Sequence, residues 1–301
     1  MRQVIQDLLA ARVGDILPNE PLAPYTTWKI GGPADVLVAP SGKAELAETI
    51  RILQRSGQPF LTIGRGSNML VSDKGVRGVV VKLGKGLDHI RIDDTAVTAG
   101  GAVSLITLSN VVGKQGLSGL EFAGGIPGTV GGAVYMNAGA HGSDMSRILK
   151  EAEIVLETGE TVRLRNDEMK FAYRHSLLHD RPGIVTEAVL ELARADRKQI
   201  AQAMAANKER RIKTQPLHLA TAGSTFRNPD DHHAARLIEE AGLKGYRVGG
   251  AEVSPLHANF IINTGGATAS DVLQLMDHIR STVRDKFGVS LTPEVLVVGE
   301  R

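Results

Sequence analysis

The sequence contains no cysteine, and this absence removes several kinds of chemistry. Disulfides, thiolate metal sites, a cysteine nucleophile and a flavin attached through sulfur are all excluded. Aromatic residues make up only 4% of the chain, so few rings are present on which nucleic-acid bases could stack. The formal net charge of +2 is too small to indicate a nucleic-acid-binding surface.

The chain also lacks a long apolar run. Gln6 and Asp7 interrupt the apolar residues near the start, which argues against a signal peptide. No stretch approaches the roughly 18 apolar residues that a membrane helix requires. We therefore expect a soluble, cytoplasmic protein with no membrane span and no nucleic-acid partner.

Two common nucleotide-binding motifs are missing as well. A Rossmann fingerprint needs a third glycine three residues after Gly66, where the chain has Met69. A Walker A loop needs a glycine five residues before its Gly-Lys pair, and the three such positions hold Leu37, Val79 and Leu108. A nucleotide bound here would have to be held in a less common way.

Glycine, by contrast, is concentrated in the stretch from Glu121 to Gly142. Dense glycine costs entropy on folding, but it lets bare main chain approach a bulky anionic ligand closely. The structural alternative is a set of tight turns between short strands. The stretch contains Pro127 and seven glycines, which are Gly124, Gly125, Gly128, Gly131, Gly132, Gly139 and Gly142.

A second glycine loop favours the ligand interpretation. Gly64-Arg65-Gly66-Ser67-Asn68 follows a predicted strand over 60–63, so its N–H groups and polar side chains could bind phosphate. Arg65 could add an ion pair, which would contribute little if exposed. Together the two loops predict a dinucleotide cradle.

The pattern of apolar residues predicts three regions of mixed α and β structure. Residues 1–83 form a first subdomain, 84–195 a second one that holds the glycine-rich stretch, and 196–301 a third lobe. The last strand is expected to return to the first subdomain. Helices are expected at the N-terminus and over 43–55, 103–114, 197–213, 232–241 and 271–287, and strands over 35–39, 60–63, 78–83, 90–92, 96–99, 184–192, 260–263 and 294–298, with a hairpin over 154–164.

Five motifs occurring in one order resemble a known family, the UDP-N-acetylenolpyruvoylglucosamine reductases. These motifs are GRGSN at 64–68, the stretch GLSGLEFAGGIPGTVGGAVYMNAGAHG at 116–142, FAYRHS at 171–176, AGSTFRNP at 222–229 and PEV at 293–295. Each motif alone is weak, but the ordered set covers nearly the whole chain.

The resemblance implies an α+β fold with a two-part FAD-binding region of the vanillyl-alcohol-oxidase type and a C-terminal substrate-binding domain. FAD would be bound non-covalently, with NADPH as the electron donor and a UDP-sugar enol ether as the substrate. His141 is the nearest candidate for a covalent flavin bond and is assigned no chemistry. The implied cofactor-binding residues are Gly64, Arg65, Gly66, Ser67, Asn68, Gly124, Gly125, Ile126, Pro127, Gly128, Gly131, Gly132, Asn137, Ala138 and Gly139.

The resemblance also implies three catalytic residues. Hydride passes from NADPH through the flavin to C3 of the enolpyruvyl group, and Arg174 would stabilise the resulting enolate. Glu294, protonated or sharing a proton, would help to stabilise the enol form, and Ser224 would deliver the proton to C2. Each has a structural alternative: a surface ion pair for Arg174, a turn cap for Ser224 and a solvating carboxylate for Glu294.

Other positions are carried over as substrate contacts or as structural residues. Lys213 and Asn228 match positions associated with the diphosphate, and Arg211, or Arg210 in its place, is expected to line the same path. His257 is expected to be structural. Adjacent residues on a helix point about 100° apart, so His232 and His233 cannot easily share a metal, and we expect no metal site.

The expected function is NADPH-dependent reduction of UDP-N-acetylglucosamine enolpyruvate to UDP-N-acetylmuramate in peptidoglycan precursor synthesis. One departure is that residues 175–223 contain no tyrosine, which indicates the shorter class of the family, without the tyrosine lid loop. Two alternatives are an oxidase of the same flavin fold and a non-catalytic module that binds flavin or a UDP-sugar. Reoxidation by substrate rather than air excludes the first, and turnover excludes the second.

Overall fold

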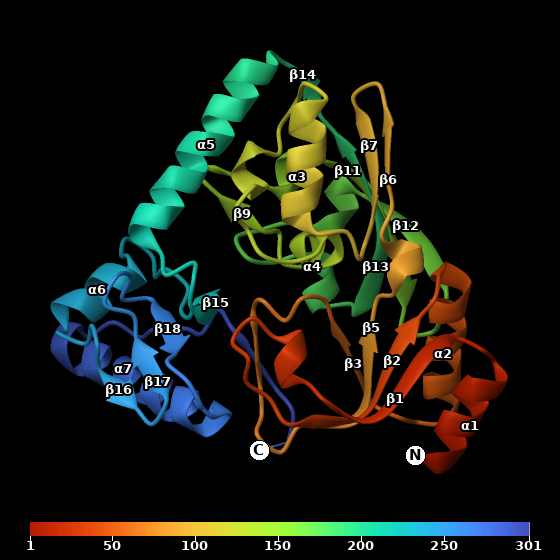
Figure 1. Cartoon of the computed structure of the whole chain (residues 1–301), viewed down its shortest axis with the longest axis horizontal. Coiled ribbons are helices and arrows are strands. Elements are labelled where there is room, and N and C mark those ends of the chain that lie inside the picture. The colour runs from red at the N-terminus through yellow and green to blue at the C-terminus, as the bar shows by residue number, and fades with distance from the viewer. Residues whose placement is uncertain (301) are drawn as a thin grey trace. The chain divides into compact units, whose positions relative to one another are not determined.

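Two helices cover the first sheet of the protein. In the computed structural model, which describes residues 1–300, helices α1 (Arg2–Ala10) and α2 (Lys43–Arg55) contact each other beside this sheet (Figure 1). Helical spacing places Leu8, Leu46 and Ile50 on inward faces, where they are fully buried. The sheet has the order β1-β2-β5-β3, with β1 at Gly14–Pro21, β2 at Pro33–Pro40, β5 at Val76–Lys82 and β3 at Phe60–Ile63.

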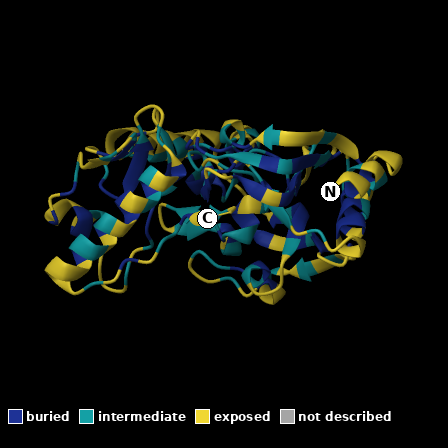
Figure 2. Cartoon of the chain, turned by 90° about the horizontal axis from the view of Figure 1, so that it is seen from below, coloured by how far each residue is buried: buried dark blue, intermediate teal, exposed yellow. Residues whose placement is uncertain are grey.

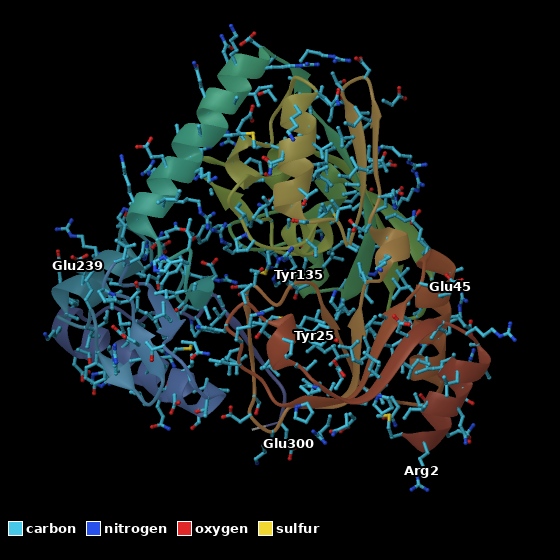
Figure 3. All side chains as sticks on the ribbon, viewed as in Figure 1. Arg2, Tyr25, Glu45, Tyr135, Glu239 and Glu300 are labelled. Atoms are coloured by element: carbon cyan, nitrogen blue, oxygen red, sulfur yellow. The ribbon has the colours of Figure 1, made fainter. Side chains whose placement is uncertain are left out.

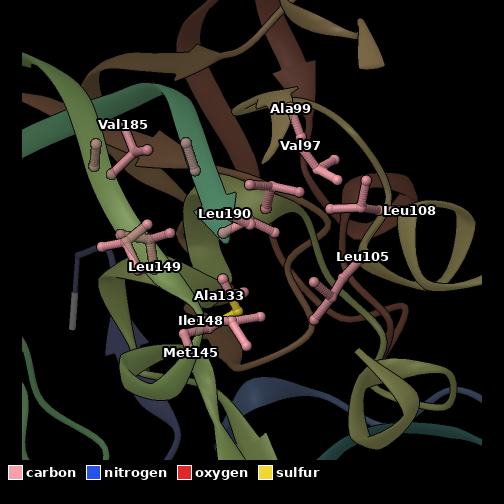
Figure 4. Close-up of a cluster of buried hydrophobic side chains, with 14 of the residues drawn as sticks. Val97, Ala99, Leu105, Leu108, Ala133, Met145, Ile148, Leu149, Val185 and Leu190 are labelled. Atoms are coloured by element: carbon pink, nitrogen blue, oxygen red, sulfur yellow. The ribbon is translucent and has the colours of Figure 1, made fainter. Parts of the chain in front are cut away.

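A five-stranded antiparallel sheet forms the next layer, in the order β12-β11-β13-β7-β6. Its central strands bury one face in a cluster that Figure 4 shows, where Val97, Val185 and Leu190 meet Leu105 and Leu108 of helix α3. Helix α4 packs on β13. The bounds are β6 Ile90–Asp93, β7 Ala96–Gly100, α3 Leu105–Lys114, α4 Val130–Tyr135, β11 Leu149–Leu156, β12 Thr161–Arg165 and β13 Gly183–Glu191.

The C-terminal part pairs a third sheet with two helices. The strand order is β15-β18-β17-β16, and Val272, Leu275 and Ile279 of α7 are fully buried in its core. Thr268 and Asp271 form a capping box at the start of α7, and Gly288 ends it in the left-handed conformation. The bounds are β15 Ala220–Ser224, α6 Ala234–Glu240, β16 Arg247–Val248, β17 Ala251–Val253, β18 Phe260–Asn263 and α7 Ala269–Phe287.

Contacts divide the chain into two compact units. The first contains residues 1–18, 36–64 and 78–210, and the second contains residues 19–35, 65–77 and 211–301. Trp28 shows why an early segment belongs to the second unit: it is fully buried there and donates its Nε1–H to Ile261 O at 2.8 Å. The finer division at residues 83 and 195 stays a prediction.

The last strand pairs with an early one. Strand β19 (Leu296–Val298) runs parallel to β4 (Met69–Val71), which lies within residues 1–83 but belongs to the second compact unit, so the return to a first subdomain stays a prediction. Figure 2 shows exposed residues mainly in loops and on the outer turns of helices. The remaining elements are β8 Leu117–Ser118, β9 Gly139–Ala140, β10 Ser143–Asp144, β14 Ala193–Arg194 and α5 Arg197–Thr214, together with short 3₁₀ helices at Ala23–Tyr25, Lys85–Leu87, Glu121–Ala123, Met145–Arg147, Asn166–Met169 and Leu177–His179.

Candidate active site

The two predicted glycine loops meet at Gly64. This residue follows β3, and a Cβ placed on it would lie only 2.8 Å from Oγ1 of Thr129, inside the glycine-rich stretch. Glycine at position 64 therefore lets the two main chains approach each other. Within the first unit, the structure brings together the start of one predicted cofactor loop and the middle of the other.

The rest of the first loop lies in the second unit. Gly66 is buried with φ +58°, and a Cβ there would meet Tyr25 O at 2.5 Å. Thr27 donates its N–H to Gly66 O at 3.3 Å, so this turn packs tightly on the chain near Tyr25 (labelled in Figure 3). Arg65 is exposed and Ser67 is half-buried. The loop thus has the close backbone contacts expected of a glycine-lined cradle.

The glycine-rich stretch is not one continuous loop. Residues Val130–Tyr135 form helix α4, and the Thr129 side chain caps it by accepting the Gly132 N–H at 3.3 Å. A Cβ on Gly131 would lie 3.1 Å from the carbonyl oxygens of Gly101 and Val185. Gly131 and Gly132 are therefore helical, and Gly131 has a packing reason to lack a side chain.

On both sides of α4, glycines adopt conformations or contacts that a side chain would disturb. Gly128 has φ +150°, a conformation that side chains disfavour, and its carbonyl accepts the Leu105 N–H at 3.1 Å. Beyond the helix, a Cβ on Gly139 would meet Ser143 O at 2.6 Å. Between these flanks and the 3₁₀ helix at Glu121–Ala123, the residues Gly124, Gly125 and Ile126 are half-buried and Pro127 is exposed.

Arg174 occupies a strained turn. Ala172 and His175 exchange two main-chain hydrogen bonds of 3.1 Å, which leaves Tyr173 and Arg174 at the tip. Arg174 has φ +54°, which costs about 1 kcal/mol or more for a residue other than glycine. Its guanidinium Nη2 donates to Gly139 O at 3.2 Å, and its Cζ lies 5.1 Å from the centre of the Tyr173 ring. Strain of this kind is concentrated at functional sites.

Asn137 connects this turn to the glycine-rich stretch. Its side chain is buried, donates from Nδ2 to Ala172 O at 3.0 Å and accepts the Ser146 N–H at 2.9 Å. The Asn137 carboxamide therefore links the Arg174 turn, through Ala172, to the main chain at Ser146. Next to it, Tyr135 (labelled in Figure 3) stacks on His179, with ring centres 4.3 Å apart.

Ser224 lies at the end of a strand with an irregular register. Strand β15 pairs with β18 through Thr221 and Ile262 and then through Ser224 and Phe260, with a register shift between the two pairs. Gly223 absorbs the shift with φ +78°. Such irregularities re-aim side chains beside active sites, and the Ser224 side chain is half-buried.

Glu294 lies beside the same segment. It donates its N–H to Thr225 O at 2.8 Å, and its own carbonyl accepts the Nδ2–H of Asn68 at 3.1 Å. Leu296 N–H in turn donates to Asn68 O at 2.9 Å. Within the second unit, the structure therefore gathers three predicted site residues: Asn68 of the first cofactor loop, and Ser224 and Glu294.

The predicted substrate residues also lie in the second unit, with different surroundings. Burial lowers the pKa of the Arg211 guanidinium, and its Nε is buried without a hydrogen-bond partner among the described residues. Lys213 is exposed near the end of α5. Asn228 is exposed, and its Oδ1 accepts the Ala234 N–H at 3.1 Å at the start of α6. Of the three, Arg211 has the buried, unused donor that an anion could take.

Asn259 supports the segment that follows Ser224, and the motifs do not single it out. It is buried, and its carboxamide bonds to the main chain of Phe226, two residues after Ser224. The signal available in the sequence is the run His257-Ala258-Asn259 directly before the strand predicted over 260–263. A single asparagine before an apolar strand has no chemistry of its own, so this run does not indicate a site.

His257 has a structural place. Its Nδ1 accepts the Asn259 N–H at 3.3 Å, which requires the neutral ring form at that nitrogen. Burial, with a smaller contribution from Lys244, lowers the pKa of His257 below its ordinary 6.5. His232 and His233 are exposed before α6, and no group of three metal-ligating side chains occurs among residues 1–300.

A pH-dependent stability follows from His257. Because its pKa is lowered on folding, the unfolded chain binds more protons below about pH 6.5. We expect the free energy of unfolding to decline as the pH falls through this range, and to decline less in His257→Asn, which keeps an acceptor. Urea unfolding midpoints between pH 5 and 8 measure this, and equal slopes in both proteins would exclude His257 as the cause.

Comparison with known proteins places this geometry in a family. Residues 215–298 match the model described as UDP-N-acetylenolpyruvoylglucosamine reductase, C-terminal domain, and residues 34–165 match an FAD binding domain. The chain is 54% identical to the UDP-N-acetylenolpyruvoylglucosamine reductase of Bacillus licheniformis and 55% identical to that of Anoxybacillus flavithermus, over 100% of both chains in each case. The chain belongs to the UDP-N-acetylenolpyruvoylglucosamine reductase family. It is an FAD-dependent oxidoreductase.

Solved structures agree with this family membership. The reductase from Thermus caldophilus superposes with a TM-score of 0.81 at 36% identity, covering 94% of this chain and 98% of that one. A variant of berberine bridge enzyme shares the flavin-binding fold alone, with a TM-score of 0.52 at 13% identity over 64% of this chain and 44% of that one. The predicted α+β flavin fold is confirmed. Among the described residues, no helix is long and apolar enough to span a membrane.

Proposed function

We propose that this reductase converts UDP-N-acetylglucosamine enolpyruvate to UDP-N-acetylmuramate, a step of peptidoglycan precursor synthesis, and that Arg174, Ser224 and Glu294 carry the chemistry. Family membership supports the reaction. The observation that carries the assignment of Ser224 and Glu294 is their gathering, with Asn68, around one main-chain segment, and the strained turn of Arg174 supports the assignment of that residue. A cofactor loop and two candidate catalytic side chains thus share a single support.

The residues fit non-covalently bound FAD. Gly64 and Gly66 lie where any Cβ would collide with neighbouring atoms, and Gly128 has a φ that other residues disfavour. These glycines let the loops pack closely on neighbouring main chain, and consecutive N–H groups of such loops can bind phosphates. Bound FAD supplies the transfer of hydride from NADPH to the enol ether. The predicted residues 64–68, 124–128, 131–132 and 137–139 are those we expect to hold it.

Each catalytic candidate is assigned one task. The Arg174 guanidinium, always protonated, would stabilise the enolate oxygen that develops as hydride reaches C3. Glu294 would share a proton with the enol oxygen, and Ser224 would donate its hydroxyl proton to C2. The Gly223 irregularity and the Glu294–Thr225 hydrogen bond hold these last two groups in fixed positions.

Substrate binding completes the proposal. We assign the diphosphate to Lys213, Arg211 and Asn228, with Arg211 supported by its buried, unpaired Nε. We further propose that the chain represents the shorter class of the family, because residues 175–223 contain no tyrosine that could act as a lid.

Anaerobic spectroscopy tests the reaction. NADPH should bleach the flavin, and UDP-N-acetylglucosamine enolpyruvate should restore the oxidised spectrum in the absence of air. Recovery only on admitting oxygen would instead indicate an oxidase of the same fold. A protein that binds flavin but neither accepts nor releases electrons would be a binding module.

Glu294→Gln tests the acid. We expect flavin reduction by NADPH to stay within about twofold and reoxidation by the enol ether to slow about 10- to 100-fold, because the amide cannot share a proton in the same way. Stopped-flow absorbance of the two half-reactions measures both. Glu239→Gln, a surface change in the same unit, is the control, and an unchanged reoxidation rate in Glu294→Gln would remove Glu294 from the site.

A further inference from the structure

The segment that follows Ser224 is clamped from two sides. On one side, Glu294 donates its N–H to Thr225 O at 2.8 Å, and Arg227 donates its N–H to Thr292 O at 2.9 Å. On the other side lies Asn259. The position of the Ser224 hydroxyl relative to Glu294 therefore depends on how firmly residues 225–227 are held.

Asn259 supplies three hydrogen bonds to this segment. Its Oδ1 accepts the Phe226 N–H at 2.9 Å, its Nδ2 donates to Phe226 O at 2.8 Å, and its main-chain carbonyl accepts the Thr225 N–H at 2.8 Å. The residue is 4% exposed, so water cannot replace these bonds. The carboxamide pairs with the N–H and the carbonyl of Phe226 as a neighbouring strand would. It does so directly after the register shift between β15 and β18.

Thr225 shows that the clamp is shared between the two catalytic candidates. Its N–H bonds to Asn259 and its carbonyl accepts the Glu294 N–H, so one peptide segment transmits any displacement of Asn259 to both Ser224 and Glu294. A misplacement of about 1 Å in such a group can cost about 100-fold in rate. The buried Asn259 carboxamide bonds to both the N–H and the carbonyl of Phe226, which keeps this segment from shifting.

We infer that Asn259 is a positioning residue for proton delivery, acting through the main chain of Thr225 and Phe226 without touching the substrate. The inference rests on the proposed function of Ser224 and Glu294. It differs from a purely structural role in what it predicts, because loss of the clamp should affect one half-reaction selectively and should depend on Ser224.

The test compares Asn259→Ala with Asn263→Ala. Asn263 is four residues further along, and its carboxamide makes three hydrogen bonds, to Trp28 O at 3.0 Å, Gly265 N at 2.9 Å and Ala267 N at 3.1 Å. Asn259→Ala loses two side-chain hydrogen bonds and Asn263→Ala loses three in the same unit, but only Asn259 bonds to the segment that follows Ser224. Both half-reactions are followed by anaerobic stopped flow, one at saturating NADPH and the other at saturating enol ether. Thermal unfolding of each variant measures its stability.

We expect Asn259→Ala to slow reoxidation by the enol ether about 100-fold while reduction by NADPH changes less than about twofold. Asn263→Ala should leave both rates near those of the unmodified enzyme. In the Ser224→Ala background, Asn259→Ala should slow reoxidation far less than 100-fold, because only Glu294 is then left for the clamp to position. Should Asn259→Ala fail to fold, Asn259→Asp, which keeps the acceptor for Phe226 N–H and loses the donor, should slow the same step about tenfold.

Three results would overturn the inference. They are a reoxidation rate in Asn259→Ala or Asn259→Asp equal to that of Asn263→Ala, equal slowing of both half-reactions, and a full multiplicative effect on top of Ser224→Ala. If the unmodified enzyme itself is not reoxidised by the enol ether, the proposed function falls and this inference with it. Normal reoxidation in the unmodified enzyme together with an unaffected Asn259 variant rejects only the role of Asn259.

Discussion

Ser224→Ala should leave reduction of the flavin by NADPH within about twofold and slow its reoxidation by the enol ether by about 10²- to 10⁴-fold. That range is what a positioned general acid typically contributes. The asymmetry arises because the proton to C2 is needed only when the substrate receives hydride. Binding should change little, since the variant removes a single oxygen from a half-buried side chain.

The measurement is an anaerobic stopped-flow comparison of the two half-reactions at saturating NADPH and then at saturating enol ether. Ser281→Ala is a matched control, because that hydroxyl bonds to His278 O on helix α7 in the same unit. Both of its rates should be unchanged. Equal slowing of the two half-reactions by Ser224→Ala, or unchanged reoxidation, would show that Ser224 is not the proton donor.

The elements with strong local signals could be predicted closely from the sequence. Helix α2 covers the predicted range 43–55, with Gly57 beyond it at φ +62°. Asp196 caps α5, accepting the N–H groups of Lys198 and Gln199 at 2.9 and 3.0 Å. The hairpin predicted over 154–164 is the pair β11 and β12, which turns at Gly159 with φ +78°. In these elements the spacing of apolar residues, the capping residues and the turn residues indicate the same structure, so the local sequence is enough to predict them.

Helix α4 and strand β1 could not be predicted in this way. Glycine is a poor helix former, so Val130–Tyr135 reads as loop until the close approach of Gly131 to the Gly101 and Val185 carbonyls is known. Strand β1 contains Pro18 and ends at Pro21, and its burial pattern does not alternate. Tertiary contacts determine both elements, and these contacts are absent from any short window of sequence.

The sequence predicts candidate catalytic residues more readily than the contacts that position them. The motifs predict Ser224, Glu294 and Arg174 as site residues, but not the left-handed backbone of Arg174 or the hydrogen bonds from Asn259. Asn259 acts on a residue 33 positions away, and only folding brings the two together. The Asn137 carboxamide bonds to Ala172 O in the Arg174 turn, a contact that spacing could not reveal, and the role of Asn137 as a cofactor contact stays a prediction.

Gly128→Val should empty the flavin site. Gly128 has φ +150°, where a β-branched residue is strongly disfavoured, so the loop before Thr129 would have to refold. If valine raises the free energy of the FAD-binding conformation by about 3 kcal/mol, FAD binds more than about 100-fold more weakly. The purified variant should therefore lose most of its flavin absorbance, and titration with FAD should restore it only at far higher concentration.

The control for general strain is Gly242→Val. Gly242 also has positive φ, at +81°, but a Cβ there has no atom within 4 Å, and the residue lies outside both predicted cofactor loops. Its variant should lose stability and keep its flavin. If Gly128→Val unfolds at the same temperature as this control yet is colourless, the main chain at Gly128 grips the cofactor. A yellow Gly128→Val protein with full occupancy would show that it does not.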